Sequence, residues 1–225
     1  MTSRYEEISS NLAIVQEKIE GAAKLAQRMR DEITLIAVTK TFPVSDVHIL
    51  ASLNIHEYGE NRDGDAVPKA SAVPGIWHFQ GQIQSNKLKS IASWADVIHS
   101  LDELRHIAAL DKVSAARIGV FLQVSLDGAQ GRGGAQPSDL SELADAVISS
   151  ANLDLMGLMA VAPLDVKSDE AFEKLATIYA KFKASYPEAK FLSAGMSNDF
   201  ESAIIHGATH IRVGSSILGS RPSAQ

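Results

Sequence analysis

Short apolar segments alternate with amphipathic ones between residues 33 and 214, and this alternation restricts the chain to few folds. Eight apolar segments are typical of buried strands, and the segments between them show the three- and four-residue spacing of helices. Such alternation builds βαβ units and a parallel sheet. Eight units in roughly 200 residues correspond to the smallest closed (β/α)8 barrels. An open doubly wound sheet is the alternative, although no Gly-x-Gly-x-x-Gly follows the first strand.

Another helix is expected before the barrel, at residues 4–30, where Ser3 with Glu6 fits a capping box. No linker-like change of composition interrupts the chain. We therefore predict one TIM-barrel domain over residues 1–225 with an extra N-terminal helix. The strands are expected at residues 33–40, 55–60, 76–81, 97–101, 117–126, 153–161, 190–195 and 210–214. The other helices are expected near residues 45–53, 62–71, 85–95, 102–113, 137–150, 168–186 and 198–207.

The composition excludes several classes of protein. The formal net charge is −6, so a domain-wide basic surface for nucleic acid is not expected. The absence of cysteine excludes disulfides, thiolate catalysis and zinc–thiolate sites. No stretch approaches the ~20 apolar residues of a membrane span, and the polar residues 1–10 are unlike a secretory signal. We expect a cytoplasmic protein that binds neither nucleic acid nor a membrane.

The first apolar segment ends in a lysine. In a strand over residues 33–40, Lys40 would share a face with Ile36 and Val38, because alternate side chains point the same way. A strand-end lysine most often only reaches water. At the rim of a barrel, however, active residues lie at the carboxyl ends of strands. Partial burial there would lower the pKa of Lys40 and make its amine a nucleophile for carbonyl groups.

The loops after the seventh and eighth strands carry a candidate phosphate site, which is where barrels commonly bind phosphate. Ser197 or Asn198 is expected to cap the next helix, whose free N–H groups could bind an anion. Gly214 allows close approach of the backbone, and Ser215 and Ser216 add hydroxyl groups. Each serine alone is more often structural, but their occurrence together at these two loops favours phosphate binding.

Arg212 precedes Gly214 by two residues and is expected on the same strand face, where a buried guanidinium needs an acceptor. Barrel closure makes the eighth strand the neighbour of the first. A phosphorylated aldehyde would then fit Lys40 and the loop serines together. Pyridoxal phosphate meets these requirements, with an aldehyde for Lys40, a phosphate for Ser197, Gly214 and Ser215, and a ring nitrogen for Arg212.

Histidines and metal ligands give weaker indications. His78, at the end of the third strand, could act as an acid or base, although a hydrogen-bonded core histidine is more common. His56, His99 and His210 also lie on predicted strands, each singly. Carboxylates at ligand spacing are not apparent, so no metal site is expected.

Several motifs stand in order along the chain: LIAVTKT at 35–41, YGEN at 58–61, WHFQGQIQSNK at 77–87, GLMA at 157–160, LSAGMSND at 192–199 and IRVGSSILG at 211–219. Together they make the chain similar to the pyridoxal phosphate homeostasis proteins, single-domain barrels related to the N-terminal domain of alanine racemases. The resemblance implies that Lys40 holds pyridoxal phosphate as an internal aldimine, with the phosphate on Ser197, Gly214 and Ser215. It places Arg212 opposite the pyridine nitrogen, and Asn61 and Met196 in the cofactor pocket.

Two positions depart from the family pattern. Ser215 stands where the family usually has threonine, so the hydroxyl group is retained. The Gly-Arg-Gly-Gly segment at residues 131–134 differs from the Lys-x-Gly expected there, so the role of this loop is left open. The role of Lys87 is also left open.

An arginine at the pyridine nitrogen leaves the ring a weak electron sink, which disfavours carbanion chemistry. Alanine racemases resemble this arrangement but take a second base, a tyrosine, from a further domain. This chain ends at Gln225, and of its tyrosines only Tyr58 comes near a strand end. We expect a monomeric cofactor carrier with little or no catalysis that could serve apo-enzymes dependent on pyridoxal phosphate. An amino-acid racemase and a Schiff-base aldolase acting on a phosphorylated substrate are the alternatives.

Overall fold

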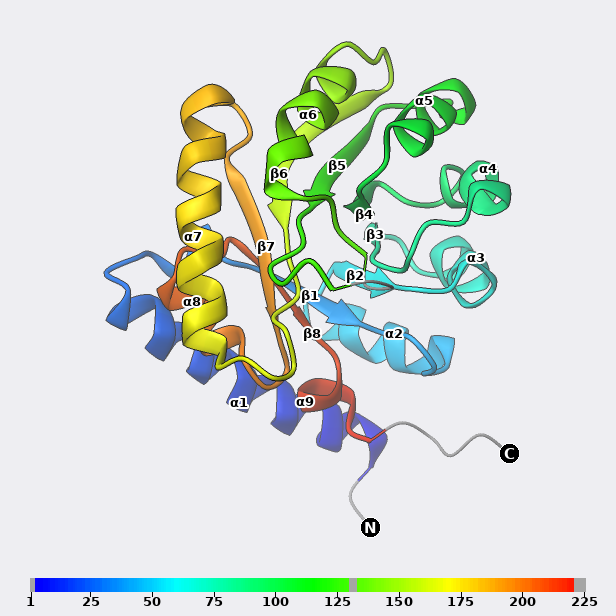
Figure 1. Cartoon of the computed structure of the whole chain (residues 1–225). Coiled ribbons are helices and arrows are strands. Elements are labelled where there is room, and N and C mark those ends of the chain that lie inside the picture. The colour runs from blue at the N-terminus through cyan, green and yellow to red at the C-terminus, as the bar shows by residue number, and fades with distance from the viewer. Residues whose placement is uncertain (1–2, 130–132, 221–225) are drawn as a thin grey trace.

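A computed structural model describes residues 3–129 and 133–220 of the chain. Eight parallel strands follow one another around a closed barrel, and the eighth pairs with the first, as predicted (Figure 1). The strands are β1 (Thr34–Val38), β2 (Glu57–Glu60), β3 (Ile76–Phe79), β4 (Val97–Leu101), β5 (Ile118–Gln123), β6 (Leu153–Met159), β7 (Phe191–Met196) and β8 (His210–Val213).

Helices surround the barrel in the expected order, but several are shorter than predicted. They are α1 (Arg4–Leu25), α2 (Val44–Ser52), α3 (Asp63–Ala72), α4 (Leu88–Ile91), α5 (Leu104–Val113), α6 (Leu140–Ile148), α7 (Ser168–Ser185), α8 (Phe200–Ile205) and α9 (Ser215–Leu218). Short 3-10 turns at Ser85–Lys87 and Pro137–Asp139 replace the first part of two predicted helices. The prediction also missed α9, which begins one residue after Gly214.

The barrel has two distinct packing surfaces. Leu35 and Ala37 of β1 point outward into the main core between strands and helices. Ile36 is also fully buried but lies outside that core, and it is level with Arg212 of β8. Alternation along each strand therefore separates an outer apolar layer from an interior that contains polar and charged side chains.

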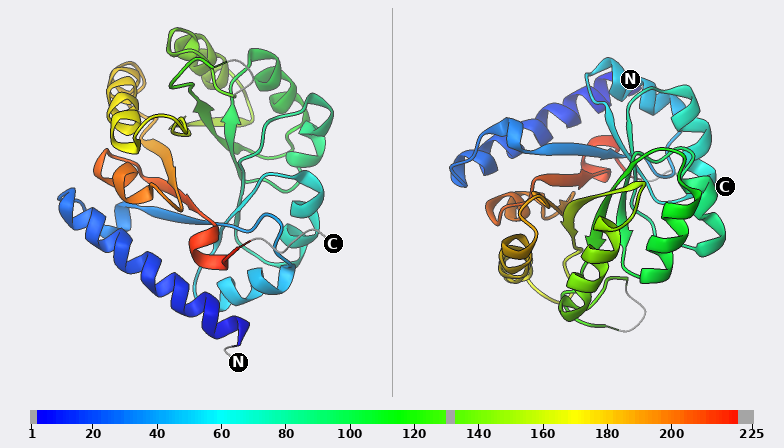
Figure 2. Two further views of the ribbon diagram at one scale, coloured as in Figure 1. Left: turned by 60° about the horizontal axis from the view of Figure 1, so that its bottom comes forward. Right: turned by 90° about the horizontal axis from the view of Figure 1, so that it is seen from above.

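Helix α1 lies across the side of the barrel covered by the short helices α8 and α9 (Figure 2). The predicted capping box is present, since Glu6 N–H donates to Ser3 Oγ and Ser3 N–H donates to Glu6. The helix ends at Leu25, five residues before the predicted boundary of 30. Gln27 adopts a φ of 55°, and Arg28 donates to two carbonyl groups after α8 and within it, so the chain turns toward β1.

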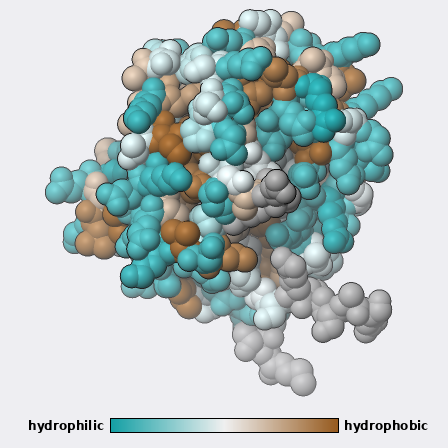
Figure 3. All heavy atoms as spheres, in the orientation of Figure 1, coloured by the Kyte–Doolittle hydropathy of each residue, from teal (hydrophilic) through white to brown (hydrophobic). Residues whose placement is uncertain are grey.

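Hydrophilic residues predominate on the face shown in Figure 3, with hydrophobic residues in small separate groups. Within residues 3–129 and 133–220, none of the helices has the length and apolarity required to cross a bilayer.

Candidate functional site

Lys40 lies in a tight turn at the carboxyl end of β1. The strand ends at Val38, so the prediction that it continues to residue 40 is wrong, and strand alternation does not determine where Lys40 points. Phe42 N–H donates to the carbonyl of Thr39 across this turn at 3.1 Å. Thr41 has a φ of 70°, a conformation that β-branched residues rarely adopt and that marks functional sites when the surroundings hold it. Lys40 is therefore presented by a constrained turn and not by the strand itself.

A buried ion pair between Lys69 and Glu60 supports this turn. The Lys69 ammonium, on α3, donates to Glu60 Oε1 at 2.6 Å and to the carbonyl oxygen of Thr39 at 2.8 Å. Thr39 Oγ1 donates to the same Glu60 oxygen at 2.7 Å. Burial raises the pKa of Glu60, and the bonds from Lys69 and Thr39 only partly offset this effect. Lys69 could not be identified from the sequence, because nothing in the local pattern distinguishes it from a surface lysine of an amphipathic helix.

The loops after β7 and β8 meet as predicted, but with different partners. Ser197 does not cap α8, because Asp199 occupies the N-cap position. Instead Ser197 Oγ accepts the N–H groups of Gly214 and Ser216 at 3.2 and 3.4 Å, and Ser216 Oγ donates to the Ser197 carbonyl. Two N–H groups thus converge on one oxygen at the start of α9. This is the donor arrangement that a phosphate oxygen requires.

We call Ser197, Gly214 and Ser216 the cradle. Close backbone packing places the cradle beside the end of β1. A Cβ on Gly214 would lie 3.1 Å from the carbonyl oxygen of Val38 and 3.3 Å from its Cβ, so a larger residue would crowd β1. Gly195 has a φ of 90° and packs against α8, and Met196 follows it at the end of β7, level with Arg212. Since Val38 precedes Lys40 by two residues, the turn and the cradle occupy neighbouring strand ends.

Arg212 is buried inside the barrel. Its Nη1 donates to Ser193 Oγ at 2.6 Å and its Nη2 to the carbonyl oxygen of Ala160 at 3.0 Å. Burial lowers the pKa of Arg212 to about 10, against a small opposing effect of Asp199. Within the described ranges, no carboxylate lies within 4.0 Å of this guanidinium. The group therefore keeps donors for a further acceptor.

The remaining predicted residue, Asn61, directly follows β2. Its carbonyl oxygen packs so closely on Gly81, after β3, that any side chain at that glycine would collide with it. In the loop at residues 131–134, the first two residues lie outside the described ranges, and the Gly134 N–H is held by Asp102 Oδ2 at 2.8 Å.

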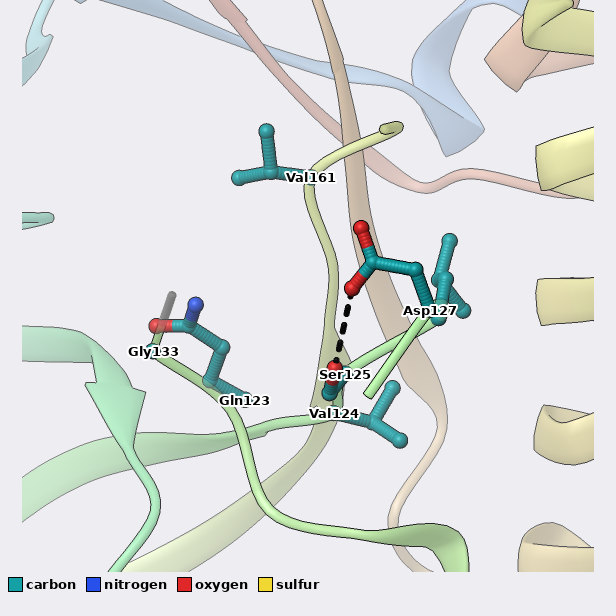
Figure 4. Close-up of a pocket in the computed structure, with 7 residues that line it drawn as sticks. Gln123, Val124, Ser125, Asp127, Gly133 and Val161 are labelled. Atoms are coloured by element: carbon teal, nitrogen blue, oxygen red, sulfur yellow. Dashed lines mark hydrogen bonds between the residues drawn. The ribbon is translucent and has the colours of Figure 1, made fainter. Parts of the chain in front are cut away.

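A pocket of about 210 Å³ opens at the carboxyl ends of β5 and β6 (Figure 4). Ser125 donates to Asp127 within it. Lys40, Ser197 and Gly214 are not among its described lining residues. It is lined by Gln123, Val124, Ser125, Leu126, Asp127, Gly133 and Val161.

Two groups differ from the sequence interpretation of histidines and tyrosines. His99 is not isolated, since His78 Nδ1 lies 2.8 Å from its Nε2. Tyr58 does not face the barrel mouth, because its hydroxyl donates to the carbonyl of Ile55 before β2 and its ring packs on Trp77 in the outer core. Burial raises the pKa of Tyr58 to about 12. The tyrosine nearest a strand end is thus unavailable as a base.

One group with metal-ligand spacing occurs in the described part of the chain. Potential ligand atoms of Asp102, Glu103 and His106 lie within 4.8 Å of one another. Asp102 already accepts the Gly134 N–H, and the Glu103 side chain is 44% exposed. Asp102, just before α5, thus holds the backbone at Gly134.

Burial makes His99 and His210 resist protonation. Both lie in the barrel interior, where His99 stacks on Phe121 at 4.5 Å and His210 meets the same ring edge-on. Burial lowers the pKa of His99 well below its ordinary value and that of His210 to about 3. The neighbouring His78 and Arg212 act on both in the same direction, and His210 also acts on His99. Both rings are therefore neutral in the folded protein near neutral pH.

Lowering the pH from about 8 to about 5 is expected to destabilise the fold by about 2 kcal/mol for each of His99 and His210. The unfolded chain takes up protons below its ordinary histidine pKa of 6.5, whereas the folded chain does not. Stability is therefore lost as the pH falls through about 6.5 and toward the folded-state values. Urea unfolding at the two pH values would measure this loss of unfolding free energy. The loss should be smaller by about 2 kcal/mol in His210→Phe than in the wild type, and an equal loss in both would contradict a neutral, buried His210.

Comparison with known proteins places this geometry in context. Residues 7–222 match the family model of the alanine racemase N-terminal domain. The pyridoxal phosphate homeostasis protein of Mycobacterium leprae is 39% identical over 240 residues, covering 96% of this chain and 93% of that protein. Its counterpart in Escherichia coli is 37% identical over 227 residues, covering 96% and 97%.

Solved structures agree with the sequence comparisons. PipY of Synechococcus elongatus, solved with PLP bound, is 28% identical with a TM-score of 0.81, covering 94% of this chain and 100% of that one. Alanine racemase from Corynebacterium glutamicum has a TM-score of 0.74 at 14% identity, covering 98% of this chain and 62% of its own, and shares the fold.

Proposed function

Because the chain belongs to the alanine racemase N-terminal domain family, and within it to the pyridoxal phosphate homeostasis proteins, we propose that it binds pyridoxal phosphate and serves homeostasis of that cofactor. Lys40 would hold the cofactor as a Schiff base. One observation carries the proposal. The constrained turn of Lys40 lies at the strand end next to the Ser197–Gly214 cradle, which places a lysine beside the proposed phosphate site.

The donor set fits a phosphorylated aldehyde. Ser197, Gly214 and Ser216 offer hydroxyl and N–H donors, and a phosphate oxygen could take the place that Ser197 Oγ now holds. Ser215 lies at the first position of α9, between the two N–H donors. Lys40 would supply the amine that bonds to the aldehyde carbon of the cofactor, and the aldehyde oxygen would leave as water. Asn61 and Met196, at the ends of β2 and β7, complete the rim of the proposed pocket.

Arg212 is proposed to face the pyridine nitrogen. The cofactor supplies an electron-accepting ring when bound, and that ring accepts electrons less well where its nitrogen stays unprotonated. Arg212 favours the unprotonated state because it is a permanent donor, here without a carboxylate partner in the described ranges. This arrangement supports holding the cofactor more than activating it.

The position of Tyr58 supports a protein with little or no catalysis. Its hydroxyl is bonded to Ile55 and its ring lies in the outer core, which removes the nearest candidate for a second base. In this role the protein would act as a cytoplasmic monomer that buffers pyridoxal phosphate and releases it to apo-enzymes.

Replacing Ser197 by alanine is expected to weaken pyridoxal phosphate binding about tenfold, since a hydrogen bond to a charged group is lost. Binding of pyridoxal, which has no phosphate, should hardly change. Absorption titrations of wild type, Ser197→Ala and the control Thr177→Ala, an exposed site on α7, would measure the ratio of the two affinities. A wild-type protein that prefers neither ligand would refute the phosphate cradle.

A further inference from the structure

A row of hydrogen-bonded side chains crosses the interior of the barrel. Arg212 Nη1 donates to Ser193 Oγ at 2.6 Å, and Ser193 Oγ lies 2.8 Å from His99 Nδ1. His99 Nε2 lies 2.8 Å from His78 Nδ1, and His78 Nε2 lies 2.6 Å from Glu57 Oε2. The row therefore joins β8, β7, β4, β3 and β2. We call these five residues the interior row.

Glu57 is the most exposed residue of the interior row, and Arg212, at the other end, is 5% exposed. Ser193 and His99 have no exposed surface, and His78 is 1% exposed. The Glu57 side chain is 28% exposed. Glu57 is the first residue of β2 and so belongs to the amino-terminal end of the barrel, opposite to the Lys40 turn. The row thus connects Arg212 with a carboxylate on the far side of the molecule.

The two ends determine the direction of every bond. Arg212 can only donate, so Ser193 Oγ accepts from it and its own proton is free to go to His99 Nδ1. A neutral His99 must then carry its proton on Nε2 and donate to His78 Nδ1. His78 in turn donates from Nε2 to the Glu57 carboxylate, which can only accept. All donors and acceptors in the row are matched.

The reverse direction is less favourable. It requires a doubly protonated His78, which would donate to His99, and His99 would then donate to Ser193 Oγ. Ser193 would receive two donors, and within the described ranges no other acceptor lies near its own proton. A second buried positive charge would also lie in the same interior as Arg212. The satisfied network is the one that runs from Arg212 to Glu57.

We propose that the interior row positions Arg212 for the pyridine nitrogen, with His99, His78 and Glu57 acting as remote positioning residues. The proposal rests on the proposed binding of pyridoxal phosphate. Bonds in a row polarise one another, so donation toward the Glu57 carboxylate strengthens Ser193 as an acceptor for Arg212. The row also gives the buried guanidinium a distant negative partner. Replacing one of these remote residues should therefore alter recognition of the ring nitrogen, although the replaced side chain does not contact the ligand.

The first test uses the protein without ligand. Long-range ¹H–¹⁵N NMR distinguishes the two tautomers of histidine, and both His78 and His99 are expected to carry the proton on Nε2. Glu57→Ala removes the terminal acceptor and should disturb this pattern, whereas Glu57→Gln keeps an acceptor oxygen and should retain it. An Nδ1–H form of His99 in the wild type, or no difference between the two variants, would overturn the direction of the row.

The second test separates positioning from mere packing. His99→Phe keeps an aromatic ring against Phe121 but breaks the row, while His99→Asn keeps an acceptor near the position of Nδ1. We expect His99→Phe to bind pyridoxal phosphate about tenfold more weakly, with His99→Asn closer to wild type. A 1-deaza analogue, which has a C–H in place of the ring nitrogen, should bind wild type and His99→Phe equally.

The outcomes distinguish the two proposals. Equal losses for both ligands would mean that His99 only packs, and unchanged affinities would mean that the row does not reach the ligand; either result overturns the positioning role. A wild type that binds neither ligand would refute the proposed function, and the NMR experiment would still decide the direction of the row. If His99→Phe fails to fold, the affinities for the same two ligands are measured on Glu57→Ala and Glu57→Gln. The Glu57 side chain is partly exposed, so these variants should disturb packing less.

Discussion

Lys40→Ala is expected to abolish the near-visible absorption band that pyridoxal phosphate forms on the wild-type protein. The Schiff base requires a primary amine, and the constrained turn presents that of Lys40 beside the cradle. The variant should still bind the phosphate group, because Ser197, Gly214 and Ser216 are unchanged. Absorption spectra, followed by borohydride reduction and peptide mapping, would locate the attached lysine.

Lys181→Ala is the matched control for this experiment, since Lys181 is exposed on α7 and far along the chain from the site. Its band should equal that of the wild type. Attachment to Lys69 in place of Lys40, or a full band in Lys40→Ala, would show that another amine binds the cofactor. Incubating the loaded wild type with L- and D-alanine then separates holding from turnover. Sustained racemisation that depends on Lys40 would favour the racemase alternative.

Glu60→Ala is expected to destabilise the fold by about 3–5 kcal/mol, because it leaves the Lys69 ammonium buried without its partner. Lys69 is 5% exposed and Glu60 is 0% exposed, so water cannot replace the lost bond. Glu60 also receives the Thr39 hydroxyl, and its second carboxylate oxygen, Oε2, is buried without a hydrogen-bond partner. Urea unfolding would measure the loss.

A double variant is the control for this prediction. Glu60→Leu with Lys69→Met replaces the pair by apolar side chains and should recover most of the lost stability, since removing both charges also removes their desolvation cost. The double variant should nevertheless loosen the Lys40 turn, because the carbonyl of Thr39 loses the Lys69 donor. If the double variant is no more stable than Glu60→Ala, the charge of Lys69 is not the cause.

The strand–helix pattern was sufficient to predict the barrel and the order of its elements. All eight predicted strand segments contain a β-strand of the barrel, and the predicted β4 boundaries, 97–101, agree with the structure. Boundaries were less accurate where the end of an element depends on other segments. Thr39 and Lys40 directly follow the apolar run but lie outside β1, because Thr39 bonds to the β2 end and a turn follows.

In the candidate site, too, local features were predictable from the sequence and contacts between distant segments were not. Motifs at the strand ends identified Lys40, Ser197, Arg212 and Gly214 as a group, because the order of strands in a barrel determines which ends are neighbours. The sequence could not show that Ser197 accepts the Gly214 N–H, 17 positions away, in place of capping α8. Helix caps are local and can be predicted from a few residues, whereas this contact requires two loops to meet.

The sequence alone thus determined the fold class, the family and the residues at the strand ends, because these depend on periodicity and on motifs within single segments. Only the tertiary structure decided which polar side chains are paired inside the barrel. His99 and Ser193 are 94 positions apart, and Lys69 and Thr39 are 30 apart. Buried donors and acceptors must find partners wherever barrel closure places them, and no local pattern along the chain records that requirement.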